Sequence, residues 1–397
     1  MKKLMILGAG ILQLPAILKA KEMGLQVIAA DMDKNAVGFK EADICLEIST
    51  IDTQRLVAAA REYRIDGVMT MASDMPMRSV AAIAEALDLV GISMETALKA
   101  TNKALMRECW AACGVPVPEF YRVEGYDQYL DAISRLKGRC IVKPADNSGS
   151  RGVFLIRDHH DESTMEYAYD YGKKYSRSGV LVVEEYMTGP EVSVETLSVD
   201  GDVNIIAITD KLTTGAPRFV EMGHSQPSGL DGSIRRQIGE AAVSAVGSIG
   251  IENGPSHTEI IITESGPKIV ELGARLGGDN ITSHLVPLST GVDMVGCCID
   301  IAMGARPVME KTISMGSAIR YFETPAGKIT DIRGVDAAQR LPGIKQISFV
   351  RNIGDIIGEV NNSADRIGFV ISQARDAGTA IRQCERAVES ITICVEG

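Results

Sequence analysis

Long hydrophobic runs are absent from this chain of 397 residues. No stretch approaches the roughly 18 consecutive apolar residues that would indicate a membrane-spanning helix. The N-terminus passes from Met1 directly into an expected strand, without the apolar segment of a secretory signal peptide. These absences argue against a membrane partner and predict a cytoplasmic protein.

Cysteine pairs with metal-site spacing are also lacking, because the eight cysteines are scattered and no CxxC occurs. Cys109 and Cys113 would share a helix face, but no histidine stands nearby to complete a zinc site. The cysteines are therefore interpreted as free, buried thiols of a reducing compartment. Aromatic residues make up only 5%, whereas glycine occurs 39 times, which is typical of an α/β protein with many tight turns.

An excess of positive charge is missing too, since the formal net charge is -11. An acidic surface repels phosphate backbones, so nucleic acid is excluded as a general partner, although a local basic pocket for a nucleotide is allowed. With 45% hydrophobic and 23% charged residues, the composition is that of a soluble globular protein. The length predicts two or three domains.

The chain begins with the pattern of a βαβ unit. An apolar run at 3–7 precedes a Gly-Ala-Gly loop at 8–10, a helical pattern continues to Met23, and an apolar strand follows at 27–30. Strand, glycine loop, helix and strand in this order indicate a parallel sheet. Residues 1–100 are therefore expected to form one doubly wound, Rossmann-like domain.

The glycine loop allows a dinucleotide site, because GxG after a strand is part of the dinucleotide-binding pattern. However, Gln13 stands where the third glycine would be, and Pro15 follows it. A βαβ unit without a dinucleotide is the preferred interpretation, and bound NAD is not expected.

A stop signal marks the next boundary. A helical pattern over 95–113 ends at Gly114, before two prolines. Beyond it, short strands alternate with turns, including an Asp-Gly hairpin signal at 200–201. The predicted fold is thus mixed, α/β and then α+β. Its expected divisions are residues 1–100, residues 101–305 with a lid subdomain at about 118–186, and a small C-terminal α+β domain at 306–397.

Two acidic residues are expected to meet across a hairpin. Residues 257–272 read as two strands joined by a three-residue loop that ends in glycine. Pairing Thr263 with Pro267 sets the register. Glu259 then lies directly opposite Glu271, with Cβ atoms about 5 Å apart. Two like charges so placed repel each other unless a cation or a proton intervenes, and a hard divalent cation, Mg²⁺ or Mn²⁺, would remove the conflict.

Two other interpretations of this pair stay open. One is a solvated hairpin in which nearby lysine or arginine relieves the glutamates. The other is a carboxylate pair for general acid–base chemistry. The apolar neighbours, with Arg275 and a Gly-Gly pair at 277–278 directly after the hairpin, favour the metal site.

A loop of small residues at 143–152 is typical of phosphate binding. It begins with Lys143 at the end of a strand and continues through Ser148 and Gly149. Small residues let backbone N–H groups approach phosphate oxygens, serine hydroxyls add donors, and the lysine adds a point charge. The pattern is not a Walker A motif, and taken alone it also fits a mobile hairpin turn. Lys103, taken alone, reads as a surface lysine of a helix.

Together these features resemble the ATP-grasp superfamily, over roughly residues 100–285. Four pieces occur in the family's order: Asn102-Lys103 with the Gly-Val-Pro-Val-Pro turn at 114–118, Lys143-Pro144 with the Gly/Ser loop, the segment Val-Glu-Glu-Tyr-Met-Thr-Gly-Pro-Glu at 183–191, and Glu259 and Glu271 with Leu272-Gly273-Ala274-Arg275. Any one piece is weak, whereas four in order are strong. The resemblance implies an ATP-grasp fold preceded by a pre-ATP-grasp domain that does not bind NAD.

The resemblance also implies roles for residues at matching positions. ATP would be held by Lys103, Lys143, Ser148 and Gly149 at the phosphates, by Glu184 and the backbone of Tyr186 and Met187 at the adenine, and by Glu191 at the ribose. The metal, Mg²⁺ or Mn²⁺, would be held by Glu259 and Glu271. Arg275, beside Lys143, would stabilise the transferring phosphoryl group or the substrate carboxylate. Many relatives have Asn where this chain has Gly273, so metal coordination here would rest more heavily on the two glutamates and water.

The activity implied is that of an ATP-dependent ligase, which activates a small-molecule carboxylate as an acyl phosphate and passes it to an amine. The best-fitting branch contains amino-acid ligases, carbamoyl phosphate synthase-like and biotin carboxylase-like proteins, so amino acids are candidate substrates. His224 is a candidate contact of the second substrate and Arg320 a candidate carboxylate contact, although both also read as structural residues. Related proteins are often dimers, which is compatible with a homodimer.

Two alternatives to this activity stay open. A carboxylating or purine-biosynthetic ATP-grasp enzyme would activate bicarbonate or a formyl or glycyl group, but no clear basic pocket for a ribose phosphate is present. A non-catalytic nucleotide sensor is the alternative of a different class. The intact glutamates of the hairpin, with Lys143 and Arg275, argue against a sensor.

Overall fold

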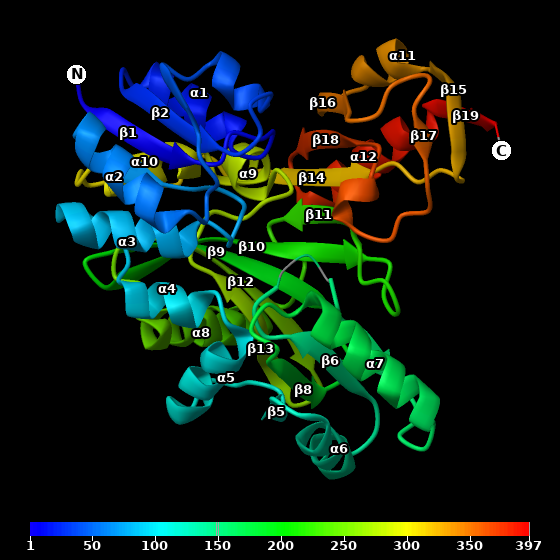
Figure 1. The fold of residues 1–397 in the computed structure, drawn as a ribbon. Helices are drawn as coiled ribbons and strands as arrows, with labels where there is room; N and C mark the ends of the chain where they lie inside the picture. Colours follow the sequence, from blue (N-terminus) through cyan, green and yellow to red (C-terminus); the bar gives the residue numbers. More distant parts are fainter. Residues whose placement is uncertain (148, 150, 397) are drawn as a thin grey trace.

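The computed structural model describes residues 1–147, 149 and 151–396, and its N-terminal part contains the expected βαβ unit. A four-stranded parallel sheet has the order β3-β2-β1-β4. Its strands are β1 (Lys3–Leu7), β2 (Gln26–Asp31), β3 (Ile44–Glu47) and β4 (Gly67–Met69). Its helices are α1 (Leu14–Glu22), the short η1 (Val37–Lys40), α2 (Thr53–Tyr63) and α3 (Met77–Leu87). Figure 1 shows this part in blue.

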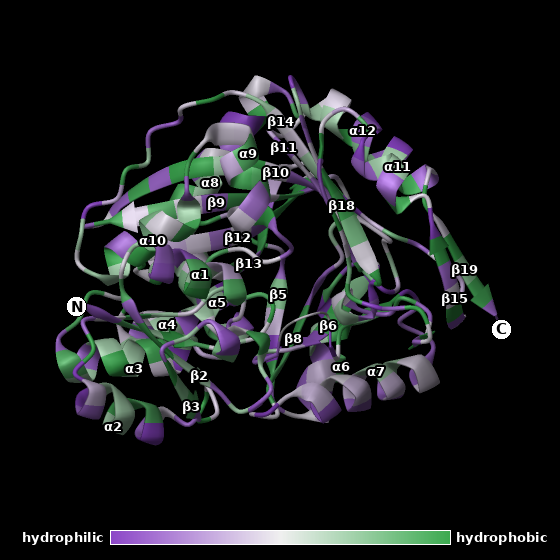
Figure 2. Ribbon diagram, turned by 90° about the horizontal axis from the view of Figure 1, so that it is seen from above, coloured by the Kyte–Doolittle hydropathy of each residue, from purple (hydrophilic) through white to green (hydrophobic). Residues whose placement is uncertain are grey.

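The helices of this part turn one apolar face inward. In α3 the buried residues include Met77, Val80, Ala81 and Ala84, which recur at the spacing of one helix face. Figure 2 shows the matching alternation of hydrophilic and hydrophobic residues along α2 and α3. Because these faces are buried against the sheet, the positions of the loops at the strand ends are held in place. One of them is the loop after β4, which contains Asp74.

The glycine loop at 8–10 is satisfied by groups of its own domain. The Gln13 Nε2 donates to the carbonyl of Met71 at 2.6 Å, and the Ala9 N–H donates to Asp31 Oδ2 at 2.8 Å. A Cβ on Gly8 would lie 3.0 Å from side-chain atoms of Gln13. Asp31, the acidic residue at the end of β2, therefore stabilises the glycine loop through a hydrogen bond.

The single helix expected over 95–113 is wrong, because two helices are present, α4 (Met94–Ala100) and α5 (Lys103–Ala112). The break lies at Asn102, whose side chain accepts hydrogen bonds from two backbone N–H groups of the following turn. Asparagine is a favoured N-cap, so it starts a new helix inside the apolar pattern. Lys103 thereby becomes the first residue of α5.

An eight-stranded antiparallel sheet with the order β13-β12-β9-β10-β11-β14-β18-β16 forms the centre of the molecule (Figure 1). Its strands are β9 (Glu191–Val199), β10 (Asp202–Thr213), β11 (Glu221–Gln226), β12 (Gly254–Thr263), β13 (Gly266–Gly273), β14 (Gly316–Tyr321), β16 (Ile344–Phe349) and β18 (Gly368–Ala374). The helix α8 (Gly232–Ile249) packs against β13 and β10. The Asp-Gly hairpin signal is confirmed between β9 and β10, where Asp200 and Gly201 have φ of 52° and 86°.

A separate four-stranded antiparallel sheet, order β5-β8-β6-β7, is called the lid sheet below. It consists of β5 (Phe120–Val123), β6 (Cys140–Pro144), β7 (Phe154–Ile156) and β8 (Leu181–Glu185), with α6 (Tyr126–Arg135) and α7 (Glu162–Tyr175). Its hydrophobic core, which includes Tyr129 and Val142, is separate from that of the central sheet. A core of its own lets the lid sheet keep its shape as one unit.

The C-terminal residues divide between two sheets. β14, β18 and β16 extend the central sheet, while β15 (Gly327–Arg333), β17 (Ile356–Ile357) and β19 (Thr392–Glu396) form a three-stranded sheet. The helices of the C-terminal half are η2 (Ile281–Leu285), α9 (Val286–Thr290), α10 (Met294–Ala302), α11 (Val335–Gln339), η3 (Ser363–Asp365) and α12 (Ala377–Glu389). Strands on both sides of residue 305 share the central sheet, and the domain division at that residue stays a prediction.

The cysteines are free, as expected, but their burial was only partly predicted. Cys140, Cys297, Cys298 and Cys384 are buried, whereas Cys45 and Cys113 are exposed. Cys113 lies at the C-terminal end of α5, and Cys45 lies in β3 at the edge of its sheet, two positions at which side chains are commonly exposed.

Among the described residues, no single helix is both long and apolar enough to cross a bilayer. One pair of helices, Ile281–Thr290 with Met294–Ala302, has the necessary length and apolar composition only when the two are taken together, and it is bent by 116°.

Candidate active site

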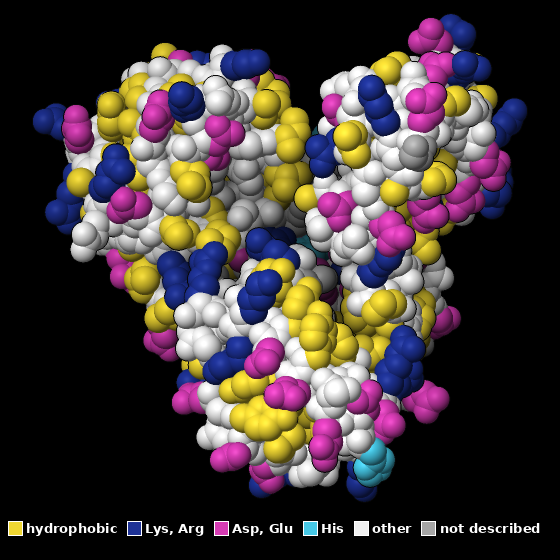
Figure 3. All heavy atoms as spheres, turned by 45° about the vertical axis from the view of Figure 1, so that its right-hand side comes forward, with side chains coloured by type: hydrophobic (Ala, Val, Ile, Leu, Met, Phe, Trp, Pro, Cys, Tyr) yellow, Lys and Arg dark blue, Asp and Glu magenta, His cyan; other side chains and the backbone are white. Residues whose placement is uncertain are grey.

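A cavity of about 390 Å³, called the cleft below, lies between the lid sheet and the central sheet. Figure 3 shows a face of the molecule that is hollowed between its lobes, with lysine and arginine side chains at the base of the hollow. Nine of the residues predicted to bind ATP or metal line the cleft: Lys103, Lys143, Gly149, Glu184, Tyr186, Met187, Glu191, Glu259 and Glu271. Ser148 lies outside the described residues.

The two glutamates of the hairpin pair with each other. Glu259 on β12 stands opposite Glu271 on β13, and both side chains remain partly exposed, at 24% and 29%. The strands β12 and β13 lie at the edge of the central sheet, next to the lid sheet in Figure 1. The arrangement places two carboxylates on one wall of the cleft.

The register that leads to this pairing was predicted wrongly at the loop. Thr263 pairs with Gly266, not with Pro267, so the strands start one residue out of the expected alignment. A β-bulge next to Glu259 corrects the shift, because the register passes over Val270. The bulge adds the one residue that the tighter turn removes.

Lys211 supplies the cation that the sequence analysis missed. Its side chain on β10 is only 2% exposed, and its Nζ lies 2.6 Å from Glu191, 2.8 Å from Glu221 and 3.3 Å from Glu259. Burial alone would lower the pKa of Lys211, but the three carboxylates raise it well above its ordinary value. This role could not be predicted locally, because Asp210-Lys211 near a strand end is usually a solvated pair.

Lys103 neutralises the second glutamate. Its Nζ lies 2.8 Å from Glu271 Oε1 and donates to the carbonyl of Asn147 at 2.7 Å. Both glutamates of the hairpin therefore have a lysine partner, which is the relief that the solvated-hairpin interpretation required. However, the two glutamates line a cavity, whereas the solvated-hairpin interpretation placed them on an open surface.

Lys143 and Glu184 form a buried ion pair on neighbouring lid strands. Arg107, which was also missed, binds the same carboxylate through Nη2 at 2.9 Å and Nε at 3.1 Å. Burial would raise the pKa of Glu184, but Arg107 and Lys143 hold it below its usual value. Burial lowers the pKa of Lys143, and Glu184 opposes that change. The carboxylate of Glu184 thus pairs with two cations, and its contact with adenine stays a prediction.

Arg107 also connects the lid sheet with the central sheet. Its Nη1 and Nη2 donate to the carbonyls of Ile269 and Val270 on β13, at 3.0 and 2.7 Å. Arg107 stands beside Glu108 in α5, so from the sequence alone it reads as one member of a solvated charged pair and not as a buried residue. Its fork of donors matches one carboxylate and two carbonyls at once.

The segment after β8 is pressed against β12. The guanidinium of Arg139 lies 4.6 Å from the ring centroid of Tyr186, and Met187 is buried. Gly189 has φ of +148°, and a Cβ there would lie 1.9 Å from the carbonyl oxygen of Ile262. Only glycine permits this approach, which fixes the wall where the adenine was predicted.

Arg275 does not line the cleft, contrary to its expected place at the transferring phosphoryl group. Its Nε lies 3.0 Å from Asp74 Oδ1 and its Nη2 lies 3.2 Å from Asp74 Oδ2. Burial would lower the pKa of Arg275, but Asp74 raises it above its ordinary value. The aspartate comes from the loop after β4, so this ion pair joins the N-terminal domain to the central sheet.

A second cavity of about 270 Å³, called the side cavity below, adjoins the cleft. Lys103, Asn147 and Glu271 line both cavities, and Asp74 lines the side cavity. The shared residues form a common wall. A molecule in the side cavity would therefore lie beside the predicted phosphate and metal positions.

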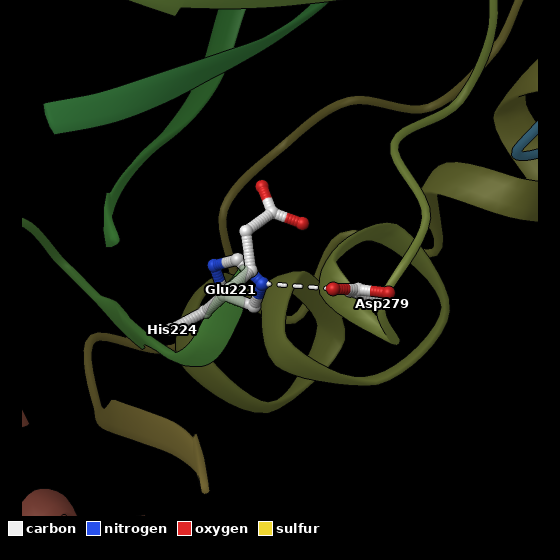
Figure 4. Close-up of side chains that lie close together, drawn as sticks. All are labelled: Glu221, His224 and Asp279. Atoms are coloured by element: carbon white, nitrogen blue, oxygen red, sulfur yellow. Dashed lines mark hydrogen bonds and ion pairs between the residues drawn. The ribbon is translucent and has the colours of Figure 1, made fainter. Parts of the chain in front are cut away.

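His224 lies with two carboxylates, Glu221 and Asp279 (Figure 4). Its buried ring places Nε2 3.3 Å from Asp279 Oδ2, and its Nδ1 has no hydrogen-bond partner among the described residues. Arg366 donates to both oxygens of Asp279 at 2.6 Å. Burial would raise the pKa of Asp279, but His224 and Arg366 hold it well below its usual range. The sequence analysis quoted Arg366 within a motif but gave it no role.

Arg320, the other candidate substrate contact, lines neither the cleft nor the side cavity. Its Nη1 donates to the carbonyls of Ile319 and His224 at 2.9 and 3.3 Å, and its Nε lies 3.5 Å from Glu385. These contacts fit the structural alternative, and the carboxylate contact stays a prediction.

Two protein-family models match this chain. Residues 136–283 match the ATP-grasp domain, and residues 320–396 match the second C-terminal domain of L-amino acid ligases. An uncharacterised protein of Sinorhizobium fredii is 30% identical over 355 residues, which cover 87% of this chain and 73% of that protein. An L-arginine-specific L-amino acid ligase of Bacillus subtilis is 27% identical over 283 residues, which cover 70% of this chain and 67% of that protein.

Solved structures show the same architecture over the whole length. The crystal structure of an L-amino acid ligase from Bacillus licheniformis superposes with a TM-score of 0.86 at 22% identity, covering 100% of this chain and 99% of the other. At this identity the likeness shows the fold alone. The expected fold class and the resemblance based on the four motifs are confirmed.

Proposed function

This chain belongs to the ATP-grasp family, and from that premise we propose that it is an ADP-forming ligase that joins a carboxylate to an amine. The amino-acid ligases among its relatives support amino acids as substrates. The observation that carries the proposal is the cleft in which the paired Glu259 and Glu271 lie on one wall with Lys103 and Lys143 beside them.

The described geometry supports one orientation of ATP in the cleft. Lys103 and Lys143 gather at one side, with the loop that contains Gly149, and this side suits the phosphates. The other side carries the aromatic ring of Tyr186 and the apolar side chain of Met187, which suit the adenine. Glu191, held by Lys211, then lies where the ribose hydroxyls are proposed to bind.

The residues present fit a divalent cation. Glu259 and Glu271 offer hard oxygen ligands. Three carboxylates, those of Glu191, Glu221 and Glu259, surround the single ammonium of Lys211, so the excess negative charge beside Glu259 favours a further cation. We propose that Glu259 and Glu271 hold Mg²⁺, which when bound supplies charge neutralisation at phosphate oxygens. Gly273 stands in the place of a further side-chain ligand, so that position adds nothing to the two carboxylates.

The two substrates are proposed to approach from different sides. The side cavity suits the carboxylate substrate, because it shares a wall with the cleft and is lined by Arg78 and Arg177. The amine is proposed to approach from the side of His224 and Asp279. The carboxylate of Glu221, and the Nδ1 of His224 that has no hydrogen-bond partner among the described residues, suit an ammonium group, whereas Asp279 is already paired with Arg366.

The reaction then needs positioning and charge neutralisation more than a protein nucleophile. A substrate carboxylate oxygen bonds to the terminal phosphorus of ATP, and ADP leaves. The amine nitrogen next bonds to the carbonyl carbon, phosphate leaves, and the nitrogen gives up a proton. Lys103 and Lys143 offset the negative charge, and the lid sheet keeps water from the acyl phosphate.

The test is Glu271→Ala, with Glu264→Ala as the matched control on the exposed turn of the same hairpin. Loss of one of two metal carboxylates is expected to lower ATP turnover by more than about a hundredfold without unfolding the chain, by analogy with a lost electrostatic donor. The control is expected to keep wild-type turnover. Phosphate release, screened with pairs of amino acids, measures both. Turnover of Glu271→Ala within about tenfold of wild type would contradict the proposal.

We also propose a homodimer in the cytoplasm. The N-terminal domain exposes the apolar side chains of Ile11, Met32 and Val37, by 62%, 76% and 40%, which suits a surface that another copy covers. Sedimentation velocity of the purified chain tests this, and a monomer at micromolar concentration would contradict it.

A further inference from the structure

Gly273 lies on the same side of β13 as Glu271, because side chains two residues apart on a strand share a face of the sheet. The register agrees with this placement, since Glu271 pairs with Glu259 and Gly273 pairs with His257 on β12. A Cβ at residue 273 would therefore point to the face that carries both glutamates of the hairpin. The glycine leaves this position without a side chain.

Two side chains from outside the strand occupy the space above Gly273. A Cβ there would lie 2.6 Å from Asp74 Oδ1 and 2.9 Å from both Cζ and Nε of Arg275. Such contacts are sterically forbidden, so any larger residue at this position would displace the Asp74–Arg275 ion pair. The φ of Gly273 is not positive, so glycine is needed here for space and not for backbone conformation.

The Asp74–Arg275 ion pair holds a cation close to Glu271. Nε and Nη2 of Arg275 lie 3.0 and 3.2 Å from the two oxygens of Asp74, and the side chains are only 15% and 17% exposed. Neighbours on the same face of a strand are about 7 Å apart, twice the rise per residue, so the guanidinium over Gly273 lies near that distance from Glu271. Burial lowers the pKa of Arg275, and Asp74 raises it, followed by Glu259 and Glu271.

Glu271 is the carboxylate for which cations compete. Lys103 already lies 2.8 Å from its Oε1, and the proposed Mg²⁺ needs the same side chain. A guanidinium binds a carboxylate through two parallel hydrogen bonds, so it can occupy both oxygens at once. Arg275 would therefore exclude a metal from Glu271 if nothing held it away. In the structure, its Nε and Nη2 are occupied by Asp74.

From this geometry, we infer that Asp74 is a positioning residue, which keeps Arg275 off Glu271 and so leaves that carboxylate to the metal. Asp74 acts through Arg275 and has no assigned contact with metal or substrate. Gly273 is the matching half of the arrangement, because it leaves room for the Asp74 carboxylate to reach the guanidinium. The inference rests on the proposed metal site, and it gives the N-terminal domain a part in metal binding.

Manganese binding by the full chain tests the inference, because it is measured without turnover. Mn²⁺ is titrated in the presence of ADP, and electron paramagnetic resonance of the free ion gives the dissociation constant. We expect Asp74→Asn to weaken Mn²⁺ binding by at least about tenfold, because the released guanidinium pairs with Glu271. Asp74→Asn/Arg275→Gln is expected to return to within about threefold of wild type, because the competing cation is gone.

Gly273→Ala tests the same arrangement with every charge kept. Its Cβ would displace the Asp74 carboxylate from Arg275, so Mn²⁺ binding is expected to weaken by at least about threefold. Gly247→Ala is the matched control, since a Cβ there meets nothing within 4 Å, and it is expected to keep wild-type affinity. Circular dichroism shows whether each variant is folded, and Gly273→Ala decides the question if Asp74→Asn is not.

Several outcomes would overturn the inference. Equal Mn²⁺ affinity of Asp74→Asn and wild type would mean that Arg275 does not compete for Glu271. Equal weakening in Asp74→Asn and in the double variant would assign Asp74 to domain attachment alone. Unchanged Mn²⁺ binding by a folded Gly273→Ala would show that the space at this residue is not needed. Absence of Mn²⁺ binding by the wild-type chain with ADP would instead overturn the proposed metal site together with this inference.

Discussion

Lys211 governs the charge balance of the cleft at the scale of single residues. One ammonium is shared by Glu191, Glu221 and Glu259, all within 3.3 Å of its Nζ. This group contains three carboxylates and one ammonium, so it carries excess negative charge. A divalent cation at Glu259 would offset that excess. Without a metal, the ammonium of Lys211 therefore reduces the repulsion between the three carboxylates.

Lys211→Met is expected to destabilise the metal-free chain. Three carboxylates would be left beside one another with no ammonium, and removal of one partner of a buried ion pair costs about 3–5 kcal/mol. Urea unfolding without divalent cations measures the change in free energy. Added Mg²⁺ is expected to restore part of it, because Glu259 then regains a cation. Lys211→Arg, which keeps the charge, is the control, and an unfolding curve of Lys211→Met equal to wild type would refute the role.

His257 gives a pH dependence at the same scale. Its Nδ1 lies 2.7 Å from Glu195 Oε1 in a buried position. Burial would lower the pKa of His257, but Glu195 raises it to about 9. The pKa of His257 is thus higher in the folded chain than its value of about 6.5 in the unfolded chain. The stability that this pair contributes is therefore complete below about pH 6.5 and is lost as the pH rises through 9.

We therefore expect the free energy of unfolding of the metal-free chain to fall between pH 7 and pH 9.5, by about 3 kcal/mol at most from this residue. His257→Gln should flatten the pH dependence in that window. Chemical denaturation at several pH values measures it. Parallel pH profiles of wild type and variant would show that His257 is not charged in the folded chain.

At the scale of elements, the contact between the 186–190 segment and β12 depends on one glycine. A Cβ at Gly189 would overlap the carbonyl of Ile262, so Gly189→Ala must displace the segment from the strand. We expect a loss of stability of about 2–4 kcal/mol together with a raised KM for ATP. Gly201→Ala is the matched control, because its φ is also positive while nothing lies within 4 Å of its Cβ. Equal effects of the two substitutions would mean that backbone strain alone, and not the overlap, is responsible.

Elements with a local signal were predictable from the sequence. The βαβ unit, the Asp-Gly hairpin and the pairing of Glu259 with Glu271 follow from periodicity and turn chemistry. The hairpin also shows the limit of such reasoning, because two errors compensated. The tighter turn at Gly266 and the bulge at Val270 each shift the register by one residue, in opposite directions. Nothing local in the sequence distinguishes the two registers.

The residues that were missed have partners distant in the sequence. Lys211, Arg107 and Asp74 read locally as solvated charges. Lys211 and Arg107 become buried, and Asp74 partly buried, only when another sheet or domain packs on them. Asn102 was misread for the opposite reason, since its capping role is local but was hidden by an apolar pattern that continues on both sides. Burial of a charged residue by a partner distant in the sequence therefore could not be predicted from local sequence patterns.

At the scale of the whole molecule, three parts of the chain meet around the cleft. The lid sheet provides Lys143, the central sheet provides Glu259 and Glu271, and Lys103 reaches in from α5. The N-terminal domain takes part through Asp74, which binds Arg275 with both carboxylate oxygens. Arg275 lies two residues after the end of β13, so this ion pair ties the N-terminal domain to the strand that carries Glu271.

Asp74→Asn is expected to loosen that attachment. The guanidinium of Arg275 would stay buried without its counter-ion, which costs about 3–5 kcal/mol, and hydrogen exchange should accelerate in β1 and β4 more than in the lid sheet. Asp88→Asn, an exposed change in the same domain, should have no such effect. A double-mutant cycle with Arg275→Gln separates the pair from its surroundings, and a coupling energy above about 1 kcal/mol is expected. Additive effects of Asp74→Asn and Arg275→Gln would contradict this role of the ion pair, and would mean that other contacts, such as apolar ones, hold the domain on the central sheet.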